Sequence, residues 1–140
     1  MTFHEKSAWI MSLLLIIVGG WYLKIVWNLS QELGQTAPPI PPLVIIAGVL
    51  VAVGATVGHT LLAIINPKDA DETKDERDKQ VLRRSGNIAG YVLGVGCFAG
   101  LWNFLVKADG NLFFHIIVFS LIASQIAEYF LTIYFYRRGA

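Results

Sequence analysis

The stretch LVIIAGVLVAVGATVGHTLLAII, residues 43–65, runs for 23 residues without Asp, Glu, Lys or Arg. A helix needs about 20 predominantly apolar residues to cross the ~30 Å hydrocarbon core of a bilayer, because it rises about 1.5 Å per residue. Three further stretches meet this condition, at residues 8–29, 86–106 and 112–136. Backbone groups in lipid must bond internally, and these stretches lack the alternation of a barrel strand. The sequence therefore predicts an all-α fold, an integral membrane four-helix bundle that forms a single domain over residues 1–140.

The composition agrees with this class of protein. Hydrophobic residues make up 55% of the 140 residues, charged residues make up 15%, and the mean hydropathy is +0.57. A soluble domain carries about 25% charged residues. The single cysteine, Cys97, excludes an internal disulfide, a CxxC motif and a cysteine-based zinc site. The net charge of +1 gives no sign of nucleic-acid binding, so we expect no nucleic acid as a partner. We expect the lipid bilayer as a partner, and no cofactor or metal.

The distribution of basic residues predicts the orientation of the chain, because cytoplasmic loops are enriched in Lys and Arg. Nine of the eleven basic residues lie before the first span, between the second and third spans, or after the fourth. The other two are Lys24 and Lys107. We therefore expect both termini and the charged loop at residues 66–85 on the cytoplasmic side. Residues 8–29 are not followed by the small-residue cleavage pattern of a signal peptide, which predicts a retained first span.

The charged loop carries the signals of a helix start. Thr73-x-x-Glu76 has the spacing of a capping box, which predicts that the third helix begins near Lys74. The acidic residues of the same run also have the spacing of a calcium-binding loop. However, Lys74 stands where that loop needs glycine, and Gln80 stands where it needs glutamate. The pattern therefore favours a solvated helix start over a metal site.

The motif Asp75-Glu76-Arg77-Asp78 is followed by Val81 and by Gly86-x-Ile88-x-Gly90 at the mouth of the third span. In this cytoplasmic motif, and in its length and topology, the chain resembles a family of small, uncharacterised four-span bacterial inner-membrane proteins. The resemblance implies the same topology and a location in the bacterial inner membrane. That family has no established activity, so the resemblance implies no catalytic residue.

Small residues recur at four-residue intervals on two of the predicted spans. Gly54 and Gly58 lie on the second span, and Gly86, Gly90 and Gly94 lie on the third. Helices in lipid associate without a hydrophobic driving force, so stripes of this kind allow the backbones to approach closely. We expect the stripes to pack helices within one chain, to form a homo-oligomer, or to do both.

Polar residues within the spans are the candidates for a substrate or proton site. Glu128 lies about 13 Å along its helix from Arg137, and His59 lies about 12 Å from Pro67, so the two have similar depths. Intramembrane ionisable residues usually face the interior of a bundle and mark functional sites. The alternative is a buried pair that only fixes the helix register. We expect a cluster near the cytoplasmic side that consists of Glu128, His59, Gln125, Asn87 and Arg83.

Two functions fit this sequence. The first is a non-catalytic bundle that associates with itself or with a cytoplasmic or membrane protein partner, and this is the function we expect. The alternative is a small proton-coupled transporter or permeation unit that uses Glu128 and His59. The sequence has no HExxH or GxSxG motif, no pair of intramembrane aspartates and no cysteine dyad, so we do not expect an enzyme.

Overall fold

The computed structural model describes residues 3–65, 67 and 75–138. These residues form four helices, which are α1 (Phe3–Leu33), α2 (Pro41–Ile65), α4 (Glu76–Lys107) and α5 (Gly110–Arg138). The all-α prediction is confirmed, and each of the four helices is long and apolar enough to cross a membrane. Each helix also extends beyond the predicted span at one end or at both ends.

The ends of the helices follow from local residue chemistry. Gly34, directly after α1, has a φ of +64°, a left-handed conformation that glycine adopts without steric cost. Pro41 opens α2, where its missing N–H would have no partner within the helix. Ala108 ends α4 in the left-handed region, and the side chain of Asp109 then accepts the backbone N–H of Leu112 at 3.0 Å. This last contact starts α5 two residues after α4 ends.

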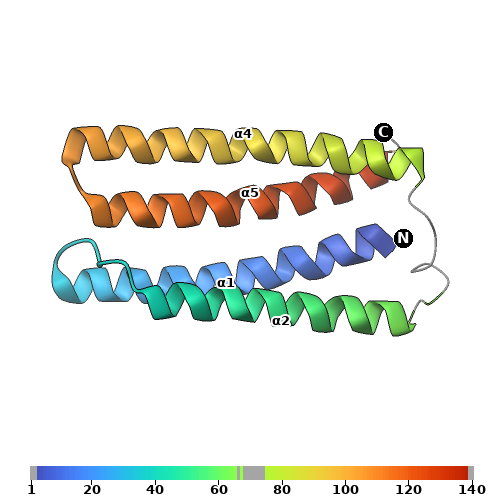
Figure 1. The fold of residues 1–140 in the computed structure, drawn as a ribbon, viewed down its shortest axis with the longest axis horizontal. Helices are drawn as coiled ribbons and strands as arrows, with labels where there is room; N and C mark the ends of the chain where they lie inside the picture. The colour runs from blue at the N-terminus through green and yellow to red at the C-terminus, as the bar shows by residue number, and fades with distance from the viewer. Residues whose placement is uncertain (1–2, 66, 68–74, 139–140) are drawn as a thin grey trace.

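The four helices lie side by side in the order α2, α1, α5, α4 (Figure 1). The extensive contacts join α2 to α1, α1 to α5, and α5 to α4, so α2 and α4 lie at the two edges of the row. The start of α1 and the end of α5 lie at the same end of the molecule, which we call the terminal end (Figure 1). The opposite end, with the connections at residues 34–40 and 108–109, is the loop end.

This open row differs from the predicted bundle, in which polar residues of the second, third and fourth spans form one cluster. Gly54 and Gly58 of α2 face α1, where a Cβ would come within 2.8 Å and 2.7 Å of the side chains of Leu14 and Ile10. His59 also turns toward α1. Gly54, Gly58 and His59 of α2 thus all contact α1. Because they are not available to contact α4 or α5, α2 lies at an edge of the row.

The contact between α4 and α5 is the most extensive of the row, and small side chains form it. The buried residues of α4 include Ser85, Ala89 and Gly100, and those of α5 include Ser120 and Ser124. The hydroxyl of Ser124 donates a hydrogen bond to the backbone oxygen of Ala89 at 2.8 Å. Gly96 lies directly against Ser120, so that any Cβ at Gly96 would overlap the serine. We call this contact the α4–α5 seam.

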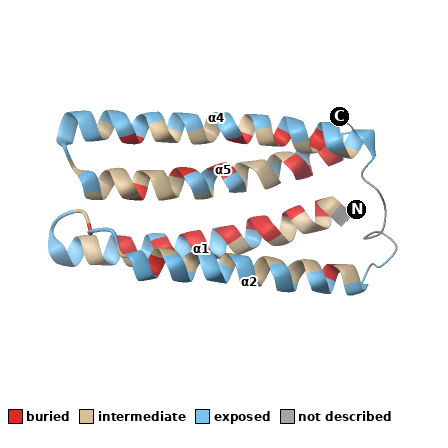
Figure 2. Ribbon diagram, viewed as in Figure 1, coloured by how far each residue is buried: buried red, intermediate tan, exposed pale blue. Residues whose placement is uncertain are grey.

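Buried residues are confined to the facing sides of the helices, and the outer faces of α2 and α4 are largely exposed (Figure 2). Many of the exposed side chains are large and apolar; they include Ile65, Tyr91, Val95 and Leu105. A water-soluble monomer rarely exposes so continuous an apolar surface. The distribution therefore agrees with a helical bundle surrounded by lipid.

The α4–α5 seam gives a direct test of the packing. We expect Gly96→Ala to lower the free energy of unfolding by about 1–3 kcal/mol, because the new methyl group overlaps Ser120 and forces the helices apart. Gly48→Ala is the matched control, since Gly48 lies within α2 and a Cβ there meets nothing within 4 Å. We expect the control to be neutral or to stabilise by up to about 1 kcal/mol, because alanine favours helix. Unfolding in mixed micelles with increasing denaturing detergent, followed by circular dichroism, measures both. Equal stability of the two variants would show that α4 and α5 do not approach closely at Gly96.

Candidate functional site

Glu128 lies on the side of α5 that faces α4, and its side chain is half-buried. Its Oε1 is 3.7 Å from the point where a Cβ on Gly86 would lie, so the missing side chain at Gly86 leaves room for the carboxylate. Its Oε2 accepts a hydrogen bond from the amide of Gln125 at 3.4 Å. The structure therefore brings together Glu128, Gln125 and Gly86 of the predicted residues.

The other predicted members of this cluster lie elsewhere. The Nε2 of His59 is 2.7 Å from the hydroxyl of Ser7 on α1, and α1 lies between α2 and α5 in the row. Asn87 is exposed because it precedes the buried Ala89 by two positions, which turns it about 160° away around the helix. Arg83 is exposed too. Matching depth did not bring His59 to Glu128, because depth along a helix does not determine the direction in which a side chain points.

The Ser7–His59 pair has the separation of a nucleophile and its base, but catalysis needs more than this pair. In an activated pair, a third group orients the imidazole. Among the described residues, no carboxylate bonds to the other nitrogen of His59. The described residues also contain no group of three or more His, Cys, Asp or Glu side chains placed to hold a metal ion. The pair therefore serves as a polar contact between α1 and α2.

The Asp75–Asp78 motif forms the start of α4. The carboxylate of Asp75 accepts the N–H of Glu76 at 2.7 Å, and the carboxylate of Asp78 accepts the N–H of Asp75 at 3.2 Å. Together they form a reciprocal capping box, with Asp75 at the N-cap. The helix thus begins at Glu76, and the prediction of a start near Lys74 is wrong by two residues. Thr73 and the rest of the acidic run, residues 68–74, lie outside the described residues.

The same motif also joins α4 to the last turn of α5. The hydroxyl of Tyr136 donates to Asp78 at 2.5 Å, and the guanidinium of Arg77 donates to the backbone oxygen of Tyr136 at 3.3 Å. Carbonyl groups in the last turn of a helix have no partner in their own helix, so Arg77 satisfies one of them. Val81 is buried against Phe135 and Tyr136 directly beside these bonds. We call this set of contacts the Asp78–Tyr136 latch.

The remaining residue of the motif, Glu76, has a smaller role. Glu76 forms an ion pair with Lys79 at 2.7 Å, and both side chains are mostly exposed. Exposed pairs of this kind contribute from nothing to about 1 kcal/mol, because water screens the charges. The structure thus gives Asp75, Arg77 and Asp78 specific contacts at the helix start, and leaves Glu76 on the surface.

A second ionic contact at the terminal end joins α1 to α5. The guanidinium of Arg137 lies 3.1 Å from the carboxylate of Glu5, whose side chain is only 9% exposed. The same guanidinium lies over the ring of Trp9, 5.9 Å from its centroid. Sequence reasoning missed Glu5, although an acid at one helix start and two arginines at another helix end are a recognisable signal. The prediction that both termini share one side would have brought these residues together.

A buried histidine organises the loop end. The Nδ1 of His115 lies 2.9 Å from the hydroxyl of Tyr22, and its Nε2 lies 2.9 Å from the backbone oxygen of Ala37. A carbonyl oxygen can only accept, so Nε2 of His115 carries a proton and donates it to Ala37. The two contacts of the ring join α5, α1 and the first connection. Sequence reasoning does not reveal it, because Tyr22 and His115 are 93 positions apart.

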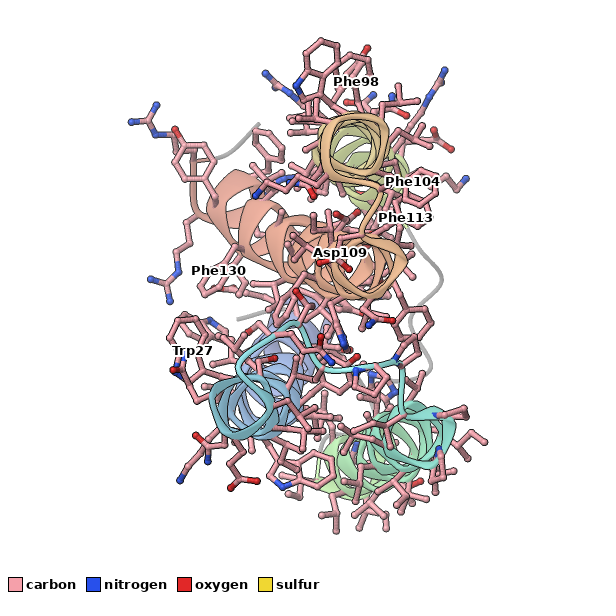
Figure 3. All side chains as sticks on the ribbon, turned by 90° about the vertical axis from the view of Figure 1, so that its left-hand side faces the viewer. Trp27, Phe98, Phe104, Asp109, Phe113 and Phe130 are labelled. Carbon is pink, nitrogen blue, oxygen red and sulfur yellow. The ribbon has the colours of Figure 1, made fainter. Side chains whose placement is uncertain are left out.

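The two connections at the loop end are bonded to each other beside this histidine. The hydroxyl of Thr36 donates to Asp109 at 2.8 Å, and the side chain of Asn111 donates to the backbone oxygen of Thr36 at 3.4 Å. The N–H of Leu112 and the hydroxyl of Thr36 hold the pKa of Asp109 below its usual value. Asp109 therefore stays ionised at neutral pH and bridges the two connections, at the front of the view in Figure 3.

A cavity of about 470 Å³ lies next to His115, between α1 and α5. Its lining is apolar toward the middle of the helices, where Leu23 and Phe119 face it, and polar at the loop end, where Gln31 and Gln35 face it. Trp27 lines its side and lies on the flank of α1 in Figure 3. The lining of the cavity thus combines an apolar part with a polar part.

Comparisons of the chain with models of protein families, with curated protein sequences and with solved structures return no match. The assignment of a function therefore depends on the geometry given above.

The Asp78–Tyr136 latch can be tested with conservative substitutions. We expect Tyr136→Phe to lower the free energy of unfolding by about 1–2 kcal/mol, because the variant loses one hydrogen bond to a charged group and keeps the ring. Tyr134→Phe is the matched control, because Tyr134 is 45% exposed and its ring lies beside Arg138 without needing the hydroxyl. A double-mutant cycle with Asp78→Asn, measured by detergent-induced unfolding, isolates the contact. Additive effects of Tyr136→Phe and Asp78→Asn would show that the latch does not form.

Proposed function

We propose that this protein is a non-catalytic, multi-pass membrane protein that associates with a second copy of itself through the outward side of α4. The observation that carries this proposal is the division of the glycines of α4 between two sides of the helix. Gly86, Gly96 and Gly100 face α5, whereas a Cβ at Gly90 or Gly94 would meet nothing within 4 Å. We call the exposed stripe of Arg83, Asn87, Gly90 and Gly94 the α4 outer face.

The chemistry of the α4 outer face suits a second helix. Its members recur every three or four residues, so they lie along one side of α4, opposite the α4–α5 seam. Small residues at this spacing let two helix backbones approach closely in lipid. The amide of Asn87 has no hydrogen-bond partner among the described residues. Because a carboxamide both donates and accepts, Asn87 can pair with its own copy across a two-fold axis.

The alternative, a proton-coupled transporter that uses Glu128 and His59, has less support. The two side chains bond to different partners on different helices, and among the described residues the side-chain hydrogen bond to the Glu128 carboxylate comes from the neutral amide of Gln125. A proton relay needs a second titratable group within hydrogen-bond reach or one water away. Self-association needs no such group.

We place the protein in a bacterial inner membrane, with both termini and the loop at residues 66–85 in the cytoplasm. The nine-to-two distribution of basic residues supports this orientation, and the resemblance of residues 75–90 to small bacterial four-span proteins supports the membrane. The start of α1 and the end of α5 both lie at the terminal end, which agrees with termini on one side of the membrane.

Self-association can be measured in vesicles by fluorescence energy transfer between labelled copies at increasing lipid dilution. We expect Gly90→Leu and Gly94→Leu to weaken association about tenfold or more, because the leucine side chains hold the two copies of α4 apart. Gly48→Leu is the matched control, since Gly48 of α2 is also exposed and also has open space around it. A protein that stays monomeric at the lowest lipid dilution, or one that Gly48→Leu weakens equally, would contradict the role of the α4 outer face.

Orientation is tested with single cysteines in a Cys97→Ala background. We expect a membrane-impermeant maleimide added to intact cells to label Gln35→Cys at the loop end. The same reagent should label Gln80→Cys, near the start of α4, only after the membrane is permeabilised. The reverse pattern would invert the proposed topology.

A further inference from the structure

A continuous groove runs along the contact of α1 with α5. The 470 Å³ cavity beside His115 adjoins a second cavity of about 200 Å³ nearer the middle of the helices. The two cavities share Leu23 and Phe119 as lining residues. We call the pair the α1–α5 groove.

The length of the α1–α5 groove matches one leaflet of a bilayer together with its headgroup region. Its lining on α1 runs from Leu15 to Gln31, sixteen positions or about 24 Å of helix. One leaflet contributes about half of the ~30 Å hydrocarbon core. Gly20 helps to form the groove, because a Cβ at this position would point into open space. Its neighbour Gly19 packs instead against Ile122 of α5.

The polarity of the groove changes along this length. Every residue around the 200 Å³ part is apolar or glycine. The loop end is lined by Ser30, Gln31, Gln35 and Thr36. The hydroxyls of Ser30 and Thr36 already donate within the protein, to Val26 and Asp109. The carboxamides of Gln31 and Gln35 have no hydrogen-bond partner among the described residues and remain able to bind a ligand.

The polar rim carries no free charge. No lysine, arginine, aspartate or glutamate lines the 470 Å³ cavity. The imidazole of His115 is its one titratable group, and both ring nitrogens are already bonded to Tyr22 and Ala37. The donors that remain are the two carboxamides and the indole N–H of Trp27, which is 62% exposed. Neutral donors and acceptors suit hydroxyl and ester oxygens, whereas the lining itself offers no positive charge to pair with a phosphate.

We propose that the α1–α5 groove binds one molecule of an uncharged glycerolipid, a lipid with a hydroxyl headgroup and ester-linked chains. One acyl chain lies along Ile16, Gly20 and Leu23, and the ester and hydroxyl oxygens bond to Gln31 and Gln35. The indole ring of Trp27 covers the junction of the chain with the head, the depth at which tryptophan concentrates in membranes. Trp27 and Phe130 lie on the same flank of the row (Figure 3). The groove is formed by α1 and α5, so this site is independent of the α4 outer face.

The site is tested by fluorescence quenching in the full chain, with Trp27 kept as the only tryptophan through Trp9→Phe, Trp21→Phe and Trp102→Phe. The protein is placed in phosphatidylcholine vesicles that contain brominated diacylglycerol or phosphatidylglycerol with the same brominated chains. We expect diacylglycerol to quench Trp27 with saturation, at a mole fraction at least tenfold lower than phosphatidylglycerol requires. Gly20→Leu should abolish the saturable quenching, because the leucine fills the groove.

The controls separate a bound lipid from ordinary lipid contact. Gly48→Leu, in an apolar hollow between α1, α2 and α5, should leave the quenching unchanged. Gln31→Leu combined with Gln35→Leu should remove the preference for diacylglycerol, and this variant tests the rim if Gly20→Leu does not fold. Quenching that rises in proportion to mole fraction and equally for both lipids would overturn the proposal, as would a preference for phosphatidylglycerol. Gly90→Leu should not affect the quenching, so the failure of self-association and the failure of the lipid site are distinguishable.

Discussion

The close approach of α4 to α5 is the contact on which the rest of the arrangement depends. In lipid, apolar side chains gain little by meeting one another, so helices associate where their backbones can come near. Gly96 against Ser120, and the bond from Ser124 to Ala89, meet this requirement along one side of α4. That side determines the rotation of α4 about its axis. Gly90 and Gly94 consequently point away from the protein, and the α4 outer face is a result of the α4–α5 seam.

Polar contacts at the two ends of the row complement this packing. At the terminal end, the Asp78–Tyr136 latch and the Glu5–Arg137 pair join the last turn of α5 to both of its neighbours. At the loop end, the imidazole of His115 joins α5 to α1 and to the first connection. A charged group costs less near water than in the middle of the hydrocarbon. The charged side chains of these contacts, Glu5, Asp78 and Arg137, accordingly lie close to helix ends, and the small-residue contacts lie farther along the helices.

The number of helices could be predicted from the sequence, because four apolar runs are each long enough to cross a membrane as a helix. Their order in the row could not be predicted. Gly86, Gly90 and Gly94 step by four, but the seam follows Ser85, Ala89, Gly96 and Gly100. Their steps of four, seven and four cover four turns and so stay closer to the period of about 3.6 residues per turn. The offsets of Glu128 and His59 predict equal depth only, and rotation about each axis decides whether such residues meet. Contacts between distant segments, such as that of Tyr22 with His115, leave no local signal in a single sequence.

The two edges of the row differ, and this difference bears on how copies of the chain can assemble. Both edges expose bulky side chains, such as Ile46 and Val49 on α2 and Tyr91 and Val95 on α4. The edge formed by α4 adds the small and polar α4 outer face. If α2 of one copy met α4 of the next, the contact would be heterologous and would leave one edge free at each step, which leads to open chains. A contact of α4 with α4 is isologous and closes at two copies. Arg83 lies seven positions, or about 10 Å, before Gly90, so its long side chain can reach the headgroup region and keep the two guanidinium groups apart. The asymmetry of the edges thus favours a closed dimer over a filament.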